Sequence, residues 1–395
     1  MENATVDLPA HLVGGINEII QKEGFNSYAV DARKVNTNGE SYMSDLFTIN
    51  IKGKTVKCNK QLNLFVKTMM VEGIENAVVS VSDVFLAETF AYNTLNKLFR
   101  KLQNDANIPI EERFEMIKMY ETSDPKSIIL ENMAIKGYKT YDRFKIIPVE
   151  LAELCVKKLA KYHALSFVIE KKDPEFYENE IKHRKINCDF DEYSGFIDHV
   201  FDNAVDVLSS EEAKNRLQNF SKTALERCKF LAEEKDTKIC VLNHGDFRIN
   251  NLLVQEKDDE FLKVIPIDYQ QMAYGHPLKD LFYFIFGSTD QEFRNNNLHH
   301  LKDLYYNSLK HFLAYFNIRT DDVWPRFQFE KDFIERLDYG MVVGPQIFPF
   351  ILAAENEIPD ISKQGLAGIS IAKDNPVYRE RIKDLVDEAM KWGII

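Results

Sequence analysis

The spacing of hydrophobic residues in the first third of the chain predicts a helix, then strands, then a second helix. Apolar positions recur at helical intervals in HLVGGINEIIQKEGF, where Gly24 provides a stop signal. Residues 81–99 are again amphipathic with helical spacing, and SIILENM at 127–133 has the apolar run of a buried strand. Between the two helices, three segments alternate inward and outward residues as strands do: YAVDARKV, DLFTINI and LNLFVKTM.

From about Ile146 onward the pattern becomes mainly helical. The longest signal is PVELAELCVKKLAKYHALSFVIEK, with Pro148 near the predicted helix start. This change predicts an α+β fold with two lobes: a smaller N-terminal lobe of sheet and helix, residues 1–133, and a larger, mainly helical C-terminal lobe, residues 134–395. The cleft between two such lobes is a common place for a small ligand to bind.

The segment VLNHGDFRINNLLV, residues 241–254, places several polar residues between two apolar flanks. The surrounding pattern predicts a hairpin: NLLVQ leaves the loop as a strand, EKDDE is a turn, and FLKVIPID returns and ends at Asp268. Because hairpin strands lie about 4.8 Å apart, we expect Asn251 beside Asp268, with Asp246 on the same loop. Pro266 in the return strand predicts an edge strand or a bulge.

Two carboxylates and an amide at one point offer hard oxygen ligands, which suit Mg²⁺ completed by water and phosphate oxygens. An aspartate, an asparagine five residues later and a further aspartate also match the phosphoryl-transfer pattern of kinases. Lys67 lies in the apolar strand LFVKT, where a buried charge needs a partner. Glu88 on the following helix is the candidate; the alternative is a Lys67 that reaches water and a Glu88 on a solvated face.

The composition narrows the class of partner. The 395 residues carry a formal net charge of −12, which argues against nucleic acid, because phosphate binding needs clustered Lys and Arg. Five cysteines without a CxxC pair indicate a reducing compartment. The first residues lack a signal-peptide pattern, and residues 340–354, with two prolines, are too short for a membrane span of about 20 residues. The sequence predicts a cytoplasmic protein with no membrane partner and, by default, a monomer.

Two segments make the kinase pattern specific. LNHGDFRINNLLV and VIPIDYQQMAYGHPLKDLFYFI resemble the ecdysteroid kinase-like (CHK kinase-like) family, which is related to choline kinase and the aminoglycoside phosphotransferases and has a protein-kinase-like fold. The resemblance covers nearly the whole chain. It implies an enzyme that uses ATP and Mg²⁺ to phosphorylate an alcohol group of a small molecule.

The resemblance also implies roles for five residues. Asp246 is the catalytic base, and Asn251 and Asp268 hold Mg²⁺. Lys67 reaches the α- and β-phosphates of ATP, and Glu88 pairs with Lys67. In the predicted register of the hairpin, Asn250 is the weaker candidate for a metal ligand, although a shift of the register by one residue would exchange it with Asn251.

The nucleotide site departs from the usual pattern in two places. No GxGxxG is present, so the turn over the phosphates falls in NTNGESYMS, with the backbone from Gly39 and the hydroxyl of Ser41 as candidate contacts. In the linker, Asn132 stands where relatives often carry an aspartate. We expect the adenine to bond to backbone near Glu131 and Met133, which does not depend on that side chain.

Four further polar residues have a structural and a functional interpretation. We interpret His244 as a brace of the loop rather than a base, and His163 as a core histidine. Asp280 is interpreted as a support of the catalytic loop near a helix start. For Arg248, a contact with phosphate or substrate and a surface salt bridge remain equally open.

The resemblance implies a steroid alcohol of the ecdysteroid type, or a hydroxylated xenobiotic in detoxification, as the acceptor. A choline-like or aminoglycoside-like acceptor is the alternative within the class. A nucleotide-binding pseudokinase without turnover is the alternative outside it. A protein kinase is disfavoured, since no D-F-G or A-P-E is found.

Overall fold

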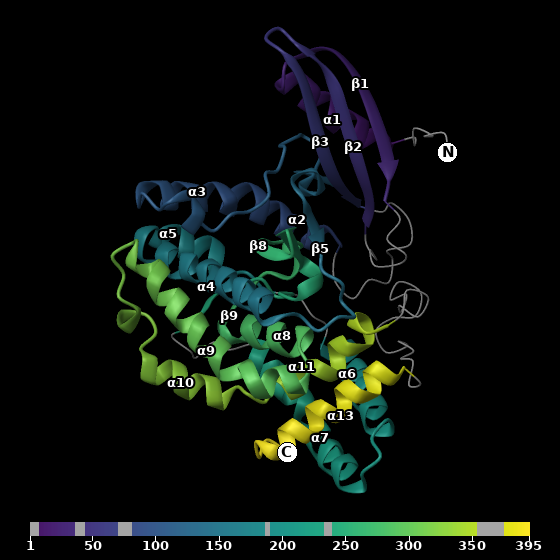
Figure 1. Cartoon of the computed structure of the whole chain (residues 1–395), viewed down its shortest axis with the longest axis vertical. Helices are drawn as coiled ribbons and strands as arrows, with labels where there is room; N and C mark the ends of the chain where they lie inside the picture. Colours follow the sequence, from purple (N-terminus) through teal and green to yellow (C-terminus); the bar gives the residue numbers. More distant parts are fainter. Residues whose placement is uncertain (1–7, 36–43, 70–80, 186–189, 233–238, 354–374) are drawn as a thin grey trace.

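The computed structural model describes residues 8–35, 44–69, 81–185, 190–232, 239–353 and 375–395. The chain forms a small lobe that carries the long strands and a larger, mainly helical lobe (Figure 1). The predicted two-lobed α+β fold is therefore confirmed. The predicted phosphate-covering contacts at Gly39 and Ser41 lie outside the described residues.

The small lobe is built on an antiparallel four-stranded sheet in the order β1-β2-β3-β4. Helix α1 packs on one face, where Leu12 and Ile16 meet Ile49, Leu64 and other buried residues in a core of their own. The predicted first helix and three strands are confirmed. The elements are α1 (Ala10–Lys22), β1 (Phe25–Lys34), β2 (Ser44–Thr55), β3 (Asn59–Met69) and β4 (Ser127–Glu131).

The strand predicted at 127–133 ends two residues early. The side chain of Asn132 accepts a hydrogen bond from the backbone N–H of Ala134 and caps a short 3₁₀ helix, η3 (Met133–Lys136). Gly137 follows with φ of 80°, a left-handed conformation that glycine adopts without steric cost. The local capping interaction therefore ends the strand where its apolar pattern would have continued.

The predicted helix after the sheet is continuous, but its middle turn is π-helical. It consists of α2 (Val81–Thr89), η1 (Phe90–Leu95) and α3 (Asn96–Asp105). Phe85, Leu95 and Phe99 from this segment belong to the large core that is shared with the helical lobe. The segment therefore anchors the sheet lobe on the helical lobe, and π-turns of this kind occur often beside functional sites.

The helical lobe is organised around α4 (Val149–Lys172), which packs along α9 (Gln291–Ala314). Nearly every residue from Leu151 to Ile169 on the inner faces of α4 is buried. Among the described residues, the other helices of this lobe are α5 (Pro174–Phe176), η4 (Tyr177–Ile181), α6 (Phe190–Asp206), α7 (Glu211–Ala232), α8 (Leu278–Ser288), α10 (Arg326–Glu335), α11 (Tyr339–Ile351) and α13 (Pro376–Lys391). Short 3₁₀ turns in this lobe are η5 (Ile249–Asn251), η6 (Tyr269–Gln271) and η7 (Thr320–Asp322), and a further one, η2 (Ile110–Glu112), precedes β4.

The C-terminal part of the chain also contains two small sheets, β5-β7-β8 and β6-β9. The predicted hairpin is confirmed, with Leu252 paired to Pro266 and a register shift after Gln255. Pro266 ends β8, an edge strand, as its lack of an N–H requires. These strands are β5 (Tyr138–Thr140), β6 (Val241–Asn243), β7 (Leu252–Lys257), β8 (Glu260–Pro266) and β9 (Ala273–Gly275).

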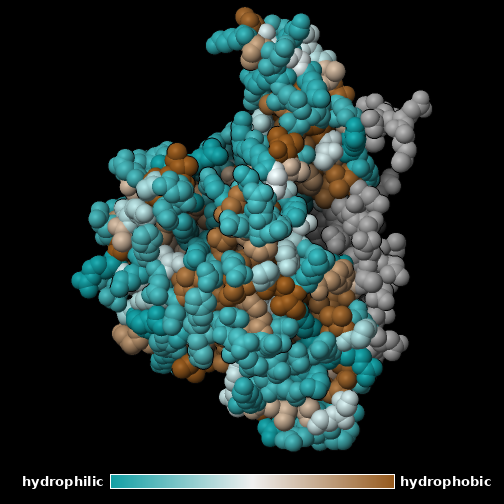
Figure 2. Space-filling view, viewed as in Figure 1, coloured by the Kyte–Doolittle hydropathy of each residue, from teal (hydrophilic) through white to brown (hydrophobic). Residues whose placement is uncertain are grey.

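The apolar stretch around residues 340–351 is buried core, as predicted. It forms α11, which keeps Pro345 and Pro349 inside the helix and packs on α8 and α13. Across the described ranges, no helix combines the length and the apolar character that crossing a membrane would need. Figure 2 shows a mainly hydrophilic face, with hydrophobic residues scattered in small areas over both lobes.

Candidate active site

Lys67 joins three segments that are distant in the sequence. Its Nζ lies 2.7 Å from Oε2 of Glu88 on α2 and 2.8 Å from Oδ1 of Asp268, two residues after β8. Alternation along β3 turns Leu64 and Val66 to the α1 core and Lys67 to the opposite face. The expected pair of Lys67 and Glu88 is present, and the solvated alternative is not what the structure shows.

Burial and charge act against each other in this cluster. Burial disfavours the charged form of Lys67, but the carboxylates of Asp268 and Glu88 outweigh burial and raise the lysine pKa above its ordinary value. Burial raises the pKa of Glu88 to about 7, against the opposing effect of Lys67. For Asp268 burial is outweighed by Lys67, which lowers the carboxyl pKa. Lys67 therefore stays charged, with Asp268 as its firmly ionised partner.

The hairpin register differs by one residue from the predicted one. The N–H of Ile267, not of Asp268, donates to the carbonyl of Asn251 at 2.9 Å. Asp268 then adopts φ of 67°, in the left-handed region that aspartate tolerates better than most residues. This turn directs its carboxylate to Lys67. Asn251 and Asp268 still leave the same end of the hairpin.

The carboxylate of Asp246 is held on both oxygens. The side-chain amide of Asn251 donates to Oδ2 at 2.7 Å and to the backbone carbonyl of Asp246 at 3.0 Å. The hydroxyl of Tyr283 donates to Oδ1 at 2.7 Å, and Nε of Arg248 lies 3.0 Å from the same oxygen. Asp246 and Asn251 are both buried. Asn251, rather than Asn250, is the asparagine that faces the aspartate.

Helix α8 supports the backbone of the same loop. Asp280 accepts the N–H of His244 at 2.6 Å and that of Gly245 at 2.9 Å. Gly245 has φ of 84°, and a Cβ there would overlap the carbonyl of Gln271. Ser288, at the end of α8, accepts the N–H of Ile249 at 3.2 Å. The interpretation of Asp280 as a support of the loop is confirmed.

His163 and His244 have structural roles. His163 is fully buried, with Nδ1 2.7 Å from the Tyr305 hydroxyl and Nε2 3.1 Å from Asp280. His244 places Nε2 3.1 Å from the carbonyl of Ile267, which ties the loop to the end of the hairpin. Burial lowers the pKa of His244, so the neutral ring is favoured. These contacts agree with the sequence interpretation of a core histidine and a loop brace.

Arg248 contacts Asp246 and also lies close enough to Asp268 to feel the charge of its carboxylate. Its side chain is about three-quarters buried and faces Asp246 rather than forming a surface salt bridge. Burial lowers the arginine pKa, but Asp246, with a further effect of Asp268, outweighs burial and raises it. The guanidinium therefore lies within the field of both carboxylates.

The oxygens at this point fit Mg²⁺. The side-chain Nδ2 of Asn251 donates twice to Asp246, so Oδ1 of Asn251 is left as an acceptor. Oδ2 of Asp268 accepts only a 3.3 Å bond from Gln270 within the described residues. Mg²⁺ prefers one or two protein oxygens, completed by water and phosphate. No group of three or more His, Cys, Asp or Glu residues suited to a metal occurs in the described ranges.

The two residues whose backbone we expect to bind adenine, Glu131 and Met133, lie where β4 ends and the linker begins. Glu131 ends β4 and Met133 begins η3. A hollow of about 470 Å³ lies on the face of the sheet that carries Lys67, next to Asn132, and its lining includes Asn50 and Asn63. It is open and lies away from Asp246.

Sequence reasoning did not find Tyr283, whose only signal is its position three residues after Asp280 on a predicted helix.

The chain is similar to one protein family and to several solved structures. The model of the ecdysteroid kinase-like family matches residues 38–318, more than two thirds of the chain. No curated protein matches. Similar solved structures include aminoglycoside phosphotransferase APH(3'')-Id from Streptomyces rimosus, with 13% identity, 80% of this chain and 96% of that chain covered, and a TM-score of 0.35. An ethanolamine kinase from Plasmodium vivax has 14% identity, coverage of 79% and 80%, and a TM-score of 0.37.

Proposed function

This chain belongs to the ecdysteroid kinase-like family, and from that premise we propose which phosphoryl transfer it performs. It is a small-molecule kinase, a phosphotransferase that acts on hydroxyl groups and binds a nucleotide. The proposed reaction moves the γ-phosphoryl group of ATP to a steroid alcohol of the ecdysteroid type or to a hydroxylated xenobiotic. The observation that supports it is the buried Asp246 carboxylate beside the cluster of Lys67, Glu88 and Asp268.

Each residue has a defined task in this proposal. Lys67, kept charged by Asp268 and Glu88, binds the α- and β-phosphates. Asn251 and Asp268 would hold Mg²⁺, which when bound neutralises charge on the phosphate oxygens. Asp246 orients the acceptor hydroxyl and receives its proton as the oxygen–phosphorus bond forms and the bond to the ADP oxygen breaks. Arg248 stabilises the negative charge of the transferring group.

The charge beside Asp246 favours an uncharged acceptor. In the described part of the chain, Asp246 is contacted by the side chains of Asn251, Arg248 and Tyr283, none of which is acidic. The Arg248 guanidinium would repel the ammonium group of choline or of an aminoglycoside. A cationic acceptor would instead need carboxylates or an aromatic cage. The alternative of a choline-like or aminoglycoside-like acceptor is therefore less favoured.

The pseudokinase alternative is also less favoured. Pseudokinases lack one or more of the groups that bind metal and activate the hydroxyl. All five candidate groups are present here: Lys67 contacts Glu88 and Asp268, and Asn251 contacts Asp246. We also propose that residues 1–133 form the nucleotide-binding lobe, with ATP at the linker near Glu131 and Met133, and residues 134–395 the acceptor-binding lobe. On sequence grounds we propose a cytoplasmic monomer.

A panel of acceptors tests the proposed function. The purified chain is incubated with Mg²⁺, γ-labelled ATP and, separately, hydroxylated steroids including an ecdysteroid, plant alcohols and amino alcohols. We expect labelled product with steroid or plant alcohols. Label in amino alcohols alone would overturn the acceptor class, and no label in any alcohol would contradict the proposed reaction. The Asp246→Asn variant serves as the negative control for contaminating kinases.

A further inference from the structure

Tyr283 contacts the proposed catalytic base directly. We infer that Tyr283 is a positioning residue: its hydroxyl fixes the Asp246 carboxylate so that a remaining lone pair of that carboxylate faces the acceptor hydroxyl. The donor–acceptor distance is 2.7 Å. The inference rests on the proposed function, because it assumes that Asp246 receives the acceptor proton.

One contact does not fix a carboxylate. The terminal torsion of aspartate is broad, so rotation about it moves the oxygens at little cost. Asn251 holds Oδ2, and by itself it would leave Oδ1 free to turn about that bond. Tyr283 holds Oδ1 from the side of α8. With Asn251 on Oδ2, and with Tyr283 and the Arg248 guanidinium on Oδ1, the plane of the carboxylate is set, and a lone pair of Oδ2 remains for the acceptor hydroxyl.

Helix α8 places the Tyr283 hydroxyl accurately. Asp280 precedes Tyr283 by three residues on the same helical face and is bonded to the backbone of His244 and Gly245. Further along, the ring of Phe284 lies edge-on to Phe247, with centroids 5.7 Å apart, and Ser288 holds Ile249. The helix and the loop are therefore joined before, at and after Asp246. Small displacements of α8 would move the base.

Tyr283 acts as a donor in this contact and not as a base. Burial and the neighbouring Asp246 carboxylate both raise the pKa of its hydroxyl. The proton therefore stays on the phenol oxygen, and the electron pair that takes the acceptor proton belongs to Asp246. Because charge-assisted hydrogen bonds are short and strongly directional, this contact restricts the carboxylate more than a neutral bond would.

Tyr306 provides a matched control. Its hydroxyl donates to the carbonyl of Trp324 at 3.0 Å, and its ring packs against Phe329. Neither contact involves Asp246 or a residue that holds it. Removing that hydroxyl costs a buried hydrogen bond without touching the base. Tyr306→Phe therefore reports the general cost of losing a tyrosine hydroxyl in this lobe, and Tyr283→Phe reports the same cost plus any effect on Asp246.

The experiment compares both variants with the alcohol that gives most labelled product in the panel. We expect Tyr283→Phe to lower kcat between about tenfold and a hundredfold, because slight misplacement of a catalytic group has effects of that size. KM for ATP and Tm should match those of Tyr306→Phe, whose kcat should equal that of the wild type. A Tyr283→Phe enzyme with unchanged kcat would overturn the inference.

A double-mutant cycle separates positioning from a general structural effect. In the Asp246→Asn background the residual rate no longer depends on a carboxylate, so adding Tyr283→Phe should change it less than about twofold. If Tyr283→Phe lowers the transfer rate by the same factor in both backgrounds, for example because the variant folds poorly, the inference is overturned and the proposed function is left intact. If the wild type labels no alcohol, the proposed function fails, and the inference fails with it.

Discussion

The Nζ of Lys67 lies 2.8 Å from Oδ1 of Asp268, although 201 residues separate them in the chain. The contact crosses from the sheet of the small lobe to the end of a hairpin in the helical lobe. It links the proposed phosphate-binding lysine to a proposed metal ligand. The relative position of the two lobes therefore bears directly on the chemistry.

Replacing Lys67 tests its proposed contact with phosphate. Lys67→Met should weaken ATP binding by about tenfold to a hundredfold, since a charge-assisted hydrogen bond contributes about 1.5–3 kcal/mol. Titration calorimetry or fluorescent-nucleotide binding measures the effect. Lys60→Met is the control, because Lys60 lies on the same strand and pairs with Glu23 at 2.6 Å. Equal affinities of the two variants would contradict the proposed role of Lys67.

Replacing Asp246 separates chemistry from binding. Asp246→Asn should leave ATP affinity nearly unchanged and reduce phosphoryl transfer by about 10²- to 10⁴-fold, because the amide cannot accept the acceptor proton as a base. Single-turnover transfer of labelled phosphate gives the rate, and equilibrium binding gives the affinity. A variant as fast as the wild type would refute the role of Asp246.

Replacing Asp268 tests the metal site. Asp268→Ala should raise by about tenfold or more the Mg²⁺ concentration that gives half-maximal activity, since a lost metal-site group costs at least as much as a lost outer-shell partner. Activity is measured across a magnesium titration at fixed ATP. Asp303→Ala, at a surface pair with Arg326, is the control. The same magnesium dependence in both variants would argue against Asp268 as a ligand.

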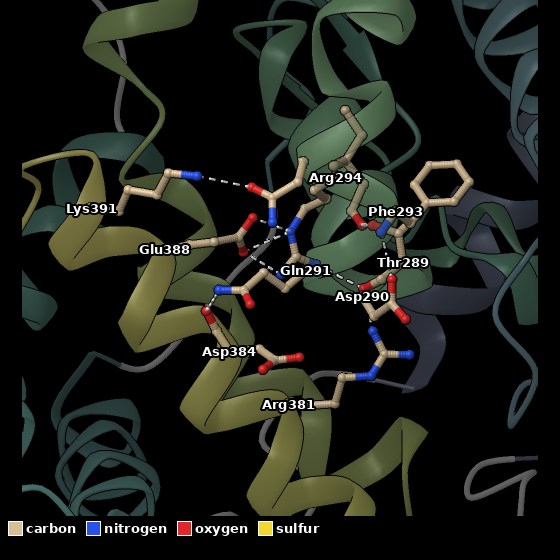
Figure 3. A network of polar contacts seen from close by, with 11 residues as sticks. Thr289, Asp290, Gln291, Phe293, Arg294, Arg381, Asp384, Glu388 and Lys391 are labelled. Atoms are coloured by element: carbon tan, nitrogen blue, oxygen red, sulfur yellow. Dashed lines mark hydrogen bonds and ion pairs between the residues drawn. The ribbon is translucent and has the colours of Figure 1, made fainter.

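Arg294 and Glu388 form a buried ion pair that joins α9 to α13. Figure 3 shows the Glu388 carboxylate facing the Arg294 side chain, with Nε of Arg294 2.9 Å from Oε2. Both side chains are almost fully buried. Arg294→Met should destabilise the protein by about 3–5 kcal/mol, because it leaves an uncompensated buried carboxylate. The midpoint of urea unfolding measures this loss. Lys383→Met, at an exposed pair on α13, should cost at most about 0.5 kcal/mol.

The same pair predicts a pH dependence. Burial raises the pKa of Glu388, and Arg294 opposes that shift. Without Arg294 the folded-state pKa rises further above the unfolded value, so the folded state binds the proton more tightly than the unfolded state. Stability of the variant then increases as pH falls through the folded-state pKa. The deficit of Arg294→Met should be smaller at about pH 5 than at about pH 8; a constant deficit would contradict this account.

Local patterns in the chain predicted most elements of the fold. The alternation of LFVKT placed Lys67 on the face opposite the core, and helical spacing located α1, α2 and α4. The loop from Asp246 to Asn251 and the hairpin that follows were recognised because they are contiguous. Resemblance of two motifs then gave the family. Each of these signals depends on residues that lie within a few positions of one another.

Other features depend on contacts between distant segments. The hairpin register includes a shift between Gln255 and Glu256, and Asp268 then takes a left-handed backbone; no residue pattern announces either feature. Tyr283 reaches Asp246, and Arg294 reaches Glu388, only because whole helices pack side by side. Periodicity tells which face of a helix is buried, but it does not tell which polar groups meet across the interface. Those partners are set by how the packed elements dock, and there the three-dimensional arrangement decides the chemistry.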